Sequence, residues 1–135
     1  MVAARRYASV QNDTASKERL MVNLFQTALR HMRAGASGLG ERNAQKRRDA
    51  LRTLDKAAQI VGYLQGTLNR DAAPKLVDEL KEIYTFTAAR LCRAIATGNP
   101  ADVQEAERAF APIADAFAQA VAKMTPAPAP AGARP

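Results

Sequence analysis

The sequence predicts an all-α protein: a four-helix up-down antiparallel bundle with a short N-terminal cap segment and a disordered Pro/Ala-rich C-terminal tail. Alanine, leucine and arginine are abundant, whereas aromatic residues make up only 5% of the 135 residues and tryptophan is absent, a composition that favours helices over strands. Four consecutive segments repeat apolar residues at spacings of three and four, as one face of a helix does. Short stretches containing glycine, asparagine or proline separate these segments, and short loops favour antiparallel neighbours.

The first helix is predicted over residues 17–36. Ser16 is the candidate N-cap, because its hydroxyl can accept a hydrogen bond from a free backbone N–H two or three residues further on. Gly35, Gly38 and Gly40 are expected to end the helix, since glycine adopts left-handed backbone angles at no steric cost. The apolar face consists of Met21, Phe25, Ala28, Met32 and Ala36, with Leu20, Leu24 and Leu29 beside it.

The second helix is predicted over residues 43–69. Gly62 and Gly66 fall inside it, and each costs about 1 kcal/mol relative to alanine in a helix interior. Such glycines either let a neighbouring helix approach closely or are simply tolerated, and the sequence leaves both explanations open. The apolar face consists of Leu51, Leu54, Ala58, Val61, Leu64 and Leu68, with Ile60 on one side.

The third helix is predicted to begin at Pro74, because proline suits the first helical position, and to run to about Thr97. Gly98 follows as the stop. The apolar face consists of Val77, Leu80, Tyr84, Ala88, Leu91 and Ile95, flanked by Leu76, Ile83 and Phe86.

The fourth helix is predicted to start after the N-cap Asn99, with Pro100 in its first turn. Pro112 lies inside this helix, where a proline lacks the N–H for one backbone hydrogen bond, so we expect a kink there. The apolar face consists of Val103, Ala106, Phe110, Ile113, Phe117, Val121 and Met124.

These elements divide the chain into three parts: an N-terminal cap segment at residues 1–15, a helical bundle at 16–124 and a Pro-Ala tail at 125–135. The tail has the composition of a segment that builds no core. The N-terminal part contains two arginines but no apolar stretch after them, which argues against a secretory signal. No stretch approaches the roughly 18 uncharged apolar residues of a membrane span, so we expect a cytoplasmic protein that does not insert into membranes.

Catalytic, metal and cofactor sites are not expected. Cys92 is the single cysteine, which excludes an internal disulfide and a cysteine-based zinc site, and we expect it to be a small buried side chain. His31 is the single histidine and has no partner nearby in sequence. The chain lacks a phosphate-binding glycine loop and a Glu-x-x-His pair, while Glu79 and Glu82 lie among lysines on a predicted solvent face. The sequence therefore predicts a non-enzymatic protein without a cofactor.

Positive charge is abundant, with a net charge of +7 and a pI of about 10.1. Arg42, Lys46, Arg47, Arg48 and Arg52 gather at the start of the second helix, where acidic residues would be more favourable. A solvated arginine-rich face is the favoured interpretation. A basic helical adaptor that binds nucleic acid or a regulatory protein is the alternative, although no aromatic residues are interleaved for stacking on single strands.

The apolar faces of the first and third helices are broader than one bundle seam needs. Leu20, Leu24, Ile60, Leu76 and Ile83 either form a surface groove or fill the flanks of the core, and the sequence does not decide between the two. A plain bundle that self-associates weakly through such spare faces is a further alternative.

Motifs along the chain match those of a known family in order and spacing. The first helix starts with Thr-Ala-Ser and a leucine four residues after the serine, the second contains a Lys-Ala motif, and the third contains spaced leucine and aromatic residues. Over about residues 4–124 the chain resembles the FliS family of flagellin-specific secretion chaperones. The matching residues are Tyr7, Thr14-Ala15-Ser16-Lys17-Glu18-Arg19-Leu20, Leu24-Phe25, Lys56-Ala57-Ala58-Gln59-Ile60-Val61-Gly62-Tyr63-Leu64, Leu80-Lys81-Glu82-Ile83-Tyr84-Thr85-Phe86, Arg90-Leu91 and Asn99-Pro100-Ala101-Asp102.

The resemblance implies an export chaperone that binds the disordered C-terminal segment of flagellin as helices in hydrophobic grooves, which prevents premature polymerisation and keeps flagellin competent for type III secretion. It also implies contacts with the export gate or a regulatory protein. Tyr7 and Val10 match the part of the family that covers the groove and is displaced by the client, although permanent packing of Tyr7 is equally open. The client-binding residues implied are Tyr7, Val10, Leu20, Leu24, Ile60, Leu64, Leu68, Leu76, Leu80, Ile83 and Tyr84.

Overall fold

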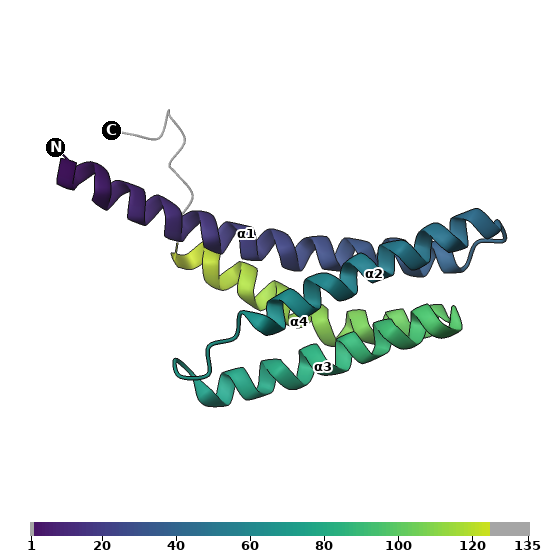
Figure 1. Cartoon of the computed structure of the whole chain (residues 1–135). Coiled ribbons are helices and arrows are strands. Elements are labelled where there is room, and N and C mark those ends of the chain that lie inside the picture. Colours follow the sequence, from purple (N-terminus) through teal and green to yellow (C-terminus); the bar gives the residue numbers. More distant parts are fainter. Residues whose placement is uncertain (1, 125–135) are drawn as a thin grey trace.

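The computed structural model describes the backbone of residues 2–124 and the side chains from Ser16 to Met124, and this part of the chain contains helices and no strand. α1 packs against α2 and α4, and α3 packs against the same two helices, so that sequence neighbours are antiparallel (Figure 1). The predicted four-helix up-down bundle is confirmed. The predicted tail lies outside the described residues. The four helices are α1 (Val2–Leu39), α2 (Ala44–Gly66), α3 (Pro74–Thr97) and α4 (Pro100–Met124).

The helix α1 is longer than predicted at both ends. It begins at Val2, so Ser16 lies inside the helix and the predicted N-cap there is wrong. Alanine and arginine near the start of the chain are good helix formers, which explains the extension. With 38 residues α1 is about 57 Å long, and its first turns extend past the ends of the other helices (Figure 1).

Two glycines predicted to end α1 lie within it instead, and only Gly40 follows its last residue. Their role is close helix packing. A Cβ atom at Gly35 would collide with the side chain of Leu54 on α2, and one at Gly38 would lie 2.7 Å from the Cβ of Ala50. The missing side chains therefore let α2 approach α1 closely.

The helix α2 begins as the sequence predicts and ends earlier. The Asn43 side chain accepts a hydrogen bond from the Lys46 backbone N–H at 3.0 Å, as an N-cap does. The helix ends at Gly66 and Thr67 caps it, so Gly66 is a terminal residue and not an interior one. The predicted bounds of α3 are confirmed, and Gly98 ends it in the left-handed conformation with φ of 72°.

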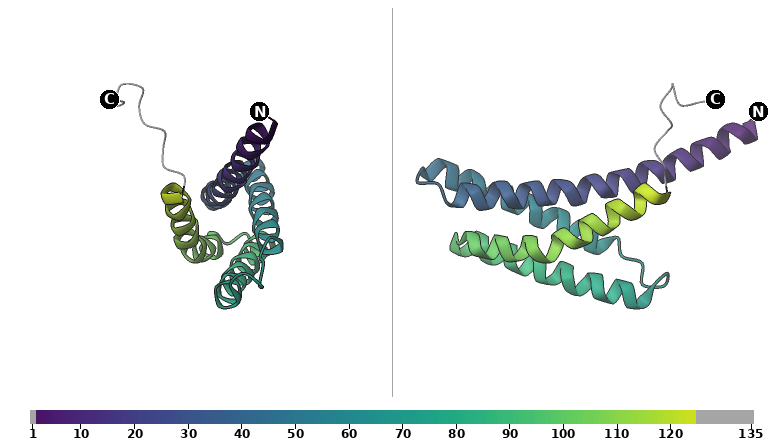
Figure 2. Two further views of the ribbon diagram at one scale, coloured as in Figure 1. Left: turned by 90° about the vertical axis from the view of Figure 1, so that its left-hand side faces the viewer. Right: turned by 180° about the vertical axis from the view of Figure 1, so that it is seen from behind.

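The fourth helix follows its predicted start and kink. The Asn99 side chain accepts a hydrogen bond from the Ala101 N–H at 3.0 Å, and Pro100 is the first helical residue. Pro112 lies inside α4, which changes direction near its middle (Figure 2). As a result α4 begins beside α3 and ends beside α1 (Figures 1 and 2).

The core runs through the middle of the bundle and includes residues from every helix. Its largest fully buried side chains come from α1, α2, α3 and α4 alike, and partly buried leucines and isoleucines surround them. These largest buried residues are Phe110, Met32, Leu54, Leu64, Leu91, Val61, Val103 and Thr87.

An ion-pair network ties α3 to the start of α4. Asp102 is only 7% exposed and lies 3.8 Å from an Arg90 nitrogen and 3.7 Å from an Arg93 nitrogen. Arg90 also pairs with Glu105 at 3.0 Å and stacks over the ring of Phe86 at 5.1 Å. Buried charges need such partners, and this network links α3 to α4 beside the turn that joins them.

Cys92 does not lie in the core, and the prediction of a buried side chain there is wrong. It is exposed and free on α3, because the helix turns Leu91 and Ala94 inward and leaves position 92 on the outer face. Within residues 16–124, no cluster of histidine, cysteine and acidic side chains could hold a metal ion. None of the described helices is long and apolar enough to cross a membrane.

The pKa of His31 is lowered from its ordinary value of 6.5, first by partial burial and then by the charges of Lys56 and Arg30. The folded chain therefore binds this proton less readily than the unfolded chain. Stability contributed by the neutral imidazole is present above pH 6.5 and is lost as the pH falls through the folded pKa.

We expect the unfolding free energy of the wild type to fall relative to that of a His31→Gln variant between about pH 7.5 and about pH 5. Urea denaturation of both proteins across this range measures the difference. A difference that stays constant with pH would show that His31 titrates alike in the folded and unfolded states.

Candidate functional site: an apolar hollow at the open end of the bundle

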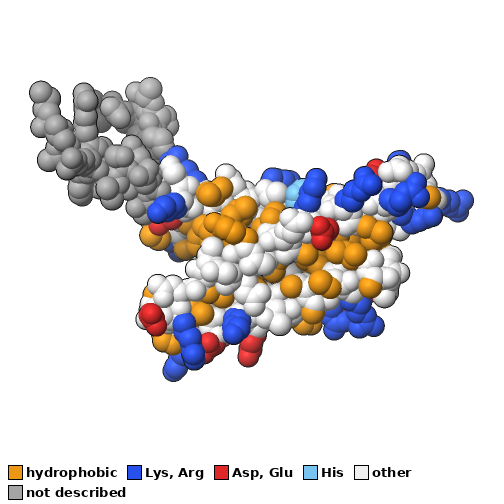
Figure 3. All heavy atoms as spheres, viewed as in Figure 1, with side chains coloured by type: hydrophobic (Ala, Val, Ile, Leu, Met, Phe, Trp, Pro, Cys, Tyr) orange, Lys and Arg blue, Asp and Glu red, His pale blue; other side chains and the backbone are white. Residues whose placement is uncertain are grey.

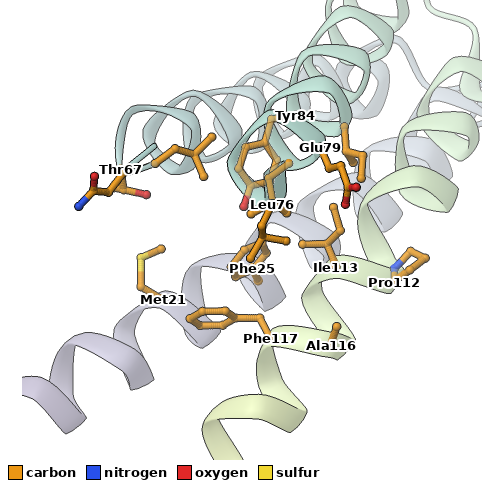
Figure 4. Close-up of a pocket in the computed structure, with 14 residues that line it drawn as sticks. Met21, Phe25, Thr67, Leu76, Glu79, Tyr84, Pro112, Ile113, Ala116 and Phe117 are labelled. Atoms are coloured by element: carbon orange, nitrogen blue, oxygen red, sulfur yellow. The ribbon is translucent and has the colours of Figure 1, made fainter. Parts of the chain in front are cut away.

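An apolar hollow of about 520 Å³ lies at the end of the bundle that carries the α2–α3 loop. Side chains from α1, α3 and α4 converge on it (Figure 4), and the surface is indented between α1 and α3 at this end (Figure 3). We call it the client hollow, after the function proposed for it below. Its lining consists of Met21, Phe25, Thr67, Leu68, Asn69, Leu76, Glu79, Leu80, Ile83, Tyr84, Pro112, Ile113, Ala116 and Phe117.

The arrangement of the helices explains why this end stays open. The helices α1 and α3 stand at opposite corners of the bundle, and their described backbones do not approach each other closely. Because α2 ends at Gly66, only the loop that follows it borders the hollow on that side. Past Pro112 the helix α4 turns away from α3 toward α1, so α4 covers the first turns of α3 less completely. Leu76 consequently remains 55% exposed.

Packed aromatic rings form the floor of the client hollow. The Phe25 ring is 2% exposed, and its centroid lies 5.2 Å from that of Phe117, 5.4 Å from that of Phe110 and 6.4 Å from that of Tyr84. Tilted ring pairs at these distances add to the stability gained from burial alone. The floor is therefore a fixed part of the core onto which a ligand can pack.

The Tyr84 side chain is 3% exposed, and burial raises the pKa of its phenol to about 12. The phenol is therefore neutral at physiological pH. A neutral tyrosine presents an apolar ring and a single polar atom, which suits the wall of an apolar site.

Apart from the Tyr84 phenol, the polar side chains that line the hollow lie at its rim. The Thr67 hydroxyl donates to the Leu64 carbonyl at 2.7 Å, and the Asn69 side chain accepts from the Asp71 N–H at 3.1 Å. Both side chains therefore already have a hydrogen-bond partner within the protein. Glu79 is exposed and forms no ion pair with any side chain described, so it places one negative charge at the rim.

The hollow brings together about half of the client-binding residues predicted from the sequence: Leu68, Leu76, Leu80, Ile83 and Tyr84 line it. They come from the α2–α3 loop and the first half of α3. Their clustering follows from the helical periodicity of α3, which places successive turns on one face.

The other predicted residues lie elsewhere. Leu20 is 53% exposed on α1, Leu64 is fully buried, and Leu24 and Ile60 are half-buried against the core. Of these four, none lines the client hollow. The side chains of Tyr7 and Val10 lie outside those described, although the backbone at both positions belongs to α1.

The contribution of α4 to the hollow was not predicted. Ile113 and Phe117 were recognised as apolar residues of this helix but were assigned only to its packing face. Met21 and Phe25 of α1 were likewise assigned to the core. Pro112 was the available signal, because a kink in an amphipathic helix directs the apolar faces before and after it in different directions.

Comparison with known families agrees with these features. The family model described as Flagellar protein FliS matches residues 1–124, which covers all four helices and every residue of the client hollow. No individual curated protein shows significant similarity to the chain. The match confirms the resemblance seen in the sequence motifs, and the chain belongs to the FliS family of flagellar protein chaperones.

Proposed function

We propose that this chain is a cytoplasmic export chaperone that binds the disordered C-terminal segment of flagellin. Binding prevents premature polymerisation and keeps the flagellin competent for type III flagellar secretion, and no catalysis is involved. The observation that carries the proposal is the client hollow itself: a FliS-family chain leaves an apolar site, with a half-exposed leucine at its edge, uncovered by its own described helices.

The size of the hollow suits side chains from one face of a helix. A helix with its side chains is about 10–12 Å across, which is too wide for complete enclosure in this space. A volume of about 520 Å³ is nevertheless ample for the apolar residues that an amphipathic helix presents at positions i, i+3 and i+4. An amphipathic client helix would therefore rest on the hollow and leave its polar face in water.

Coupled folding fits the task of an export chaperone. A disordered client that becomes helical on binding loses conformational entropy, and that loss limits the net affinity of even a large interface. Limited affinity favours release of the client at the export apparatus. The client also returns to an unfolded state on release, as passage through a narrow channel requires.

The N-terminal segment is proposed to cover the client hollow in the absence of flagellin. The helix α1 passes from this segment directly to Met21, which lines the hollow. Since α1 is continuous from Val2, covering the hollow requires the helix to open between Ser16 and Met21. Tyr7 and Val10 would then supply the contacts, and client binding would displace them.

The test is a calorimetric titration of the chain with monomeric flagellin and with flagellin that lacks its C-terminal segment. We expect binding only with the full-length client, accompanied by a gain of helical signal in far-UV circular dichroism and by slower flagellin polymerisation. Equal binding of both flagellins, or binding of neither, would refute the proposal.

A further inference from the structure

The positive charge of the chain is concentrated at the α1–α2 turn and on the first half of α2. Residues 42–56 contain six lysines and arginines and only two acidic residues, and so account for +4 of the net charge of +7. Basic side chains visibly gather at this end of the molecule (Figure 3). The six residues are Arg42, Lys46, Arg47, Arg48, Arg52 and Lys56.

Helix stability does not explain this cluster. The first turn of α2 contains no acidic residue, although the partial positive charge of a helix N-terminus favours acids there. Arg48, Arg52 and Lys56 follow one another at intervals of four residues, and like charges at this spacing repel each other along a helix. The arrangement therefore lowers the stability of α2, which points to a role outside the fold.

Few of these cations have a partner within the described chain. Arg47 braces the turn, because its guanidinium donates to the backbone carbonyls of Glu41 at 2.9 Å and Arg42 at 2.6 Å. Arg52 lies 3.9 Å from Asp49, and both side chains are mostly exposed, so this contact is weak.

Along α2, Arg48 donates to the Gln45 amide oxygen at 2.8 Å, and neither Arg48 nor Lys56 pairs with a carboxylate among the side chains described. By contrast, Arg33 pairs with Glu107 across the bundle. Arg48, Arg52 and Lys56 thus form an available row of charge, which we call the basic edge.

A shallow hollow of about 550 Å³ runs beside the basic edge, along the seam between α2 and α3. Its apolar contacts are Leu51 and Ile95, both half-buried, and its rim carries Arg52 and Lys56. The lining also includes Asp55, whose carboxylate accepts a hydrogen bond of 2.7 Å from the Gln59 amide. None of these lining residues belongs to the client hollow.

We propose that the basic edge binds an acidic amphipathic helix of a partner protein, with an apolar side chain in the α2–α3 hollow and carboxylates facing Arg48, Arg52 and Lys56. Four residues of helix rise by about 6 Å, so acidic residues spaced by four on the partner match the spacing of these cations.

A protein partner fits this surface better than nucleic acid does. Asp49 and Asp55 interrupt the row of cations and would repel a continuous phosphate backbone. The α2–α3 hollow has no aromatic side chain in its lining on which a base could stack. Paired apolar and cationic contacts are instead the complement of a helix that carries both leucine and glutamate.

The test measures fluorescence anisotropy of a labelled helical peptide in which one leucine is flanked at i±3 and i±4 by glutamates. The variant Arg52→Glu/Lys56→Glu is compared with Lys81→Glu/Arg108→Glu, which changes the net charge equally at exposed positions away from the basic edge. We expect the first variant to weaken binding about tenfold at about 50 mM salt and the control less than about twofold. Replacing the peptide leucine with serine should weaken binding about fivefold.

Three results would overturn the proposal. Equal losses in the two charge variants would mean that only net charge matters. If single-stranded DNA bound more tightly than the peptide, and if that binding required Arg52 and Lys56, the basic edge would be a nucleic-acid site. If Arg52→Glu/Lys56→Glu weakened flagellin binding as much as it weakened peptide binding, the basic edge would belong to the client site. Failure of flagellin to bind the wild type, by contrast, would contradict only the function proposed above.

Discussion

Replacing Leu76 with aspartate is expected to weaken binding of the flagellin C-terminal segment by about 100-fold, or about 2.7 kcal/mol. Leu76 lies at the mouth of the client hollow and is 55% exposed, so its remaining apolar surface becomes buried only when a client helix covers it. Complete burial of a leucine side chain is worth about 1.5–3 kcal/mol. The aspartate would in addition have to lose water at an apolar interface, one helical turn from Glu79.

Leu20→Asp is the matched control for this prediction. Leu20 is 53% exposed, nearly the same as Leu76, and lies on a helix that also lines the hollow, but it does not line the hollow itself. We expect this variant to retain wild-type affinity within about threefold in the same calorimetric titration. Because both leucines are exposed, neither change should alter the unfolding free energy by more than about 0.5 kcal/mol. Equal loss of affinity in the two variants would place the client on a broader surface of α1 and α3.

The helices were predictable because their signals are local. Helical periodicity, the Asn99 cap and the Gly98 stop each act within a few residues, and the structure confirms them. The ends of α1 were not predictable in this way. Gly35 and Gly38 have the sequence appearance of a stop, but contacts with α2 decide their role, and those contacts exist only in the folded bundle.

About half of the predicted client-binding residues line the client hollow, because only part of the hollow depends on local signals. The periodicity of α3 identifies Leu80 and Ile83 as members of one face. Which face remains uncovered depends on where α2 ends and on how far Pro112 bends α4, and both are properties of the assembled helices. Leu64 shows the limit of the approach: it has the same apolar periodicity as the lining residues and is fully buried.

Gly35→Ala is expected to lower the unfolding free energy by about 1–2 kcal/mol, although alanine is normally the better helix former by about 1 kcal/mol. The added methyl group would collide with the side chain of Leu54, which is fully buried in the core. Either Leu54 leaves its preferred rotamer or α2 moves away from α1, and both responses disturb the close packing of α1 against α2. Guanidinium denaturation monitored by circular dichroism measures the loss.

Gly62→Ala carries the opposite expectation and serves as the control. Gly62 lies within α2, is exposed, and has no atom within 4 Å of the position that a Cβ would take. The only effect left is the higher helix propensity of alanine relative to glycine. The substitution should therefore raise the unfolding free energy by about 0.5–1 kcal/mol. The opposite signs of the two changes separate packing from propensity. If Gly35→Ala also stabilised the protein, α1 and α2 would not approach each other as closely as the structure has them, and the close contact of Gly38 with Ala50 would be in doubt as well.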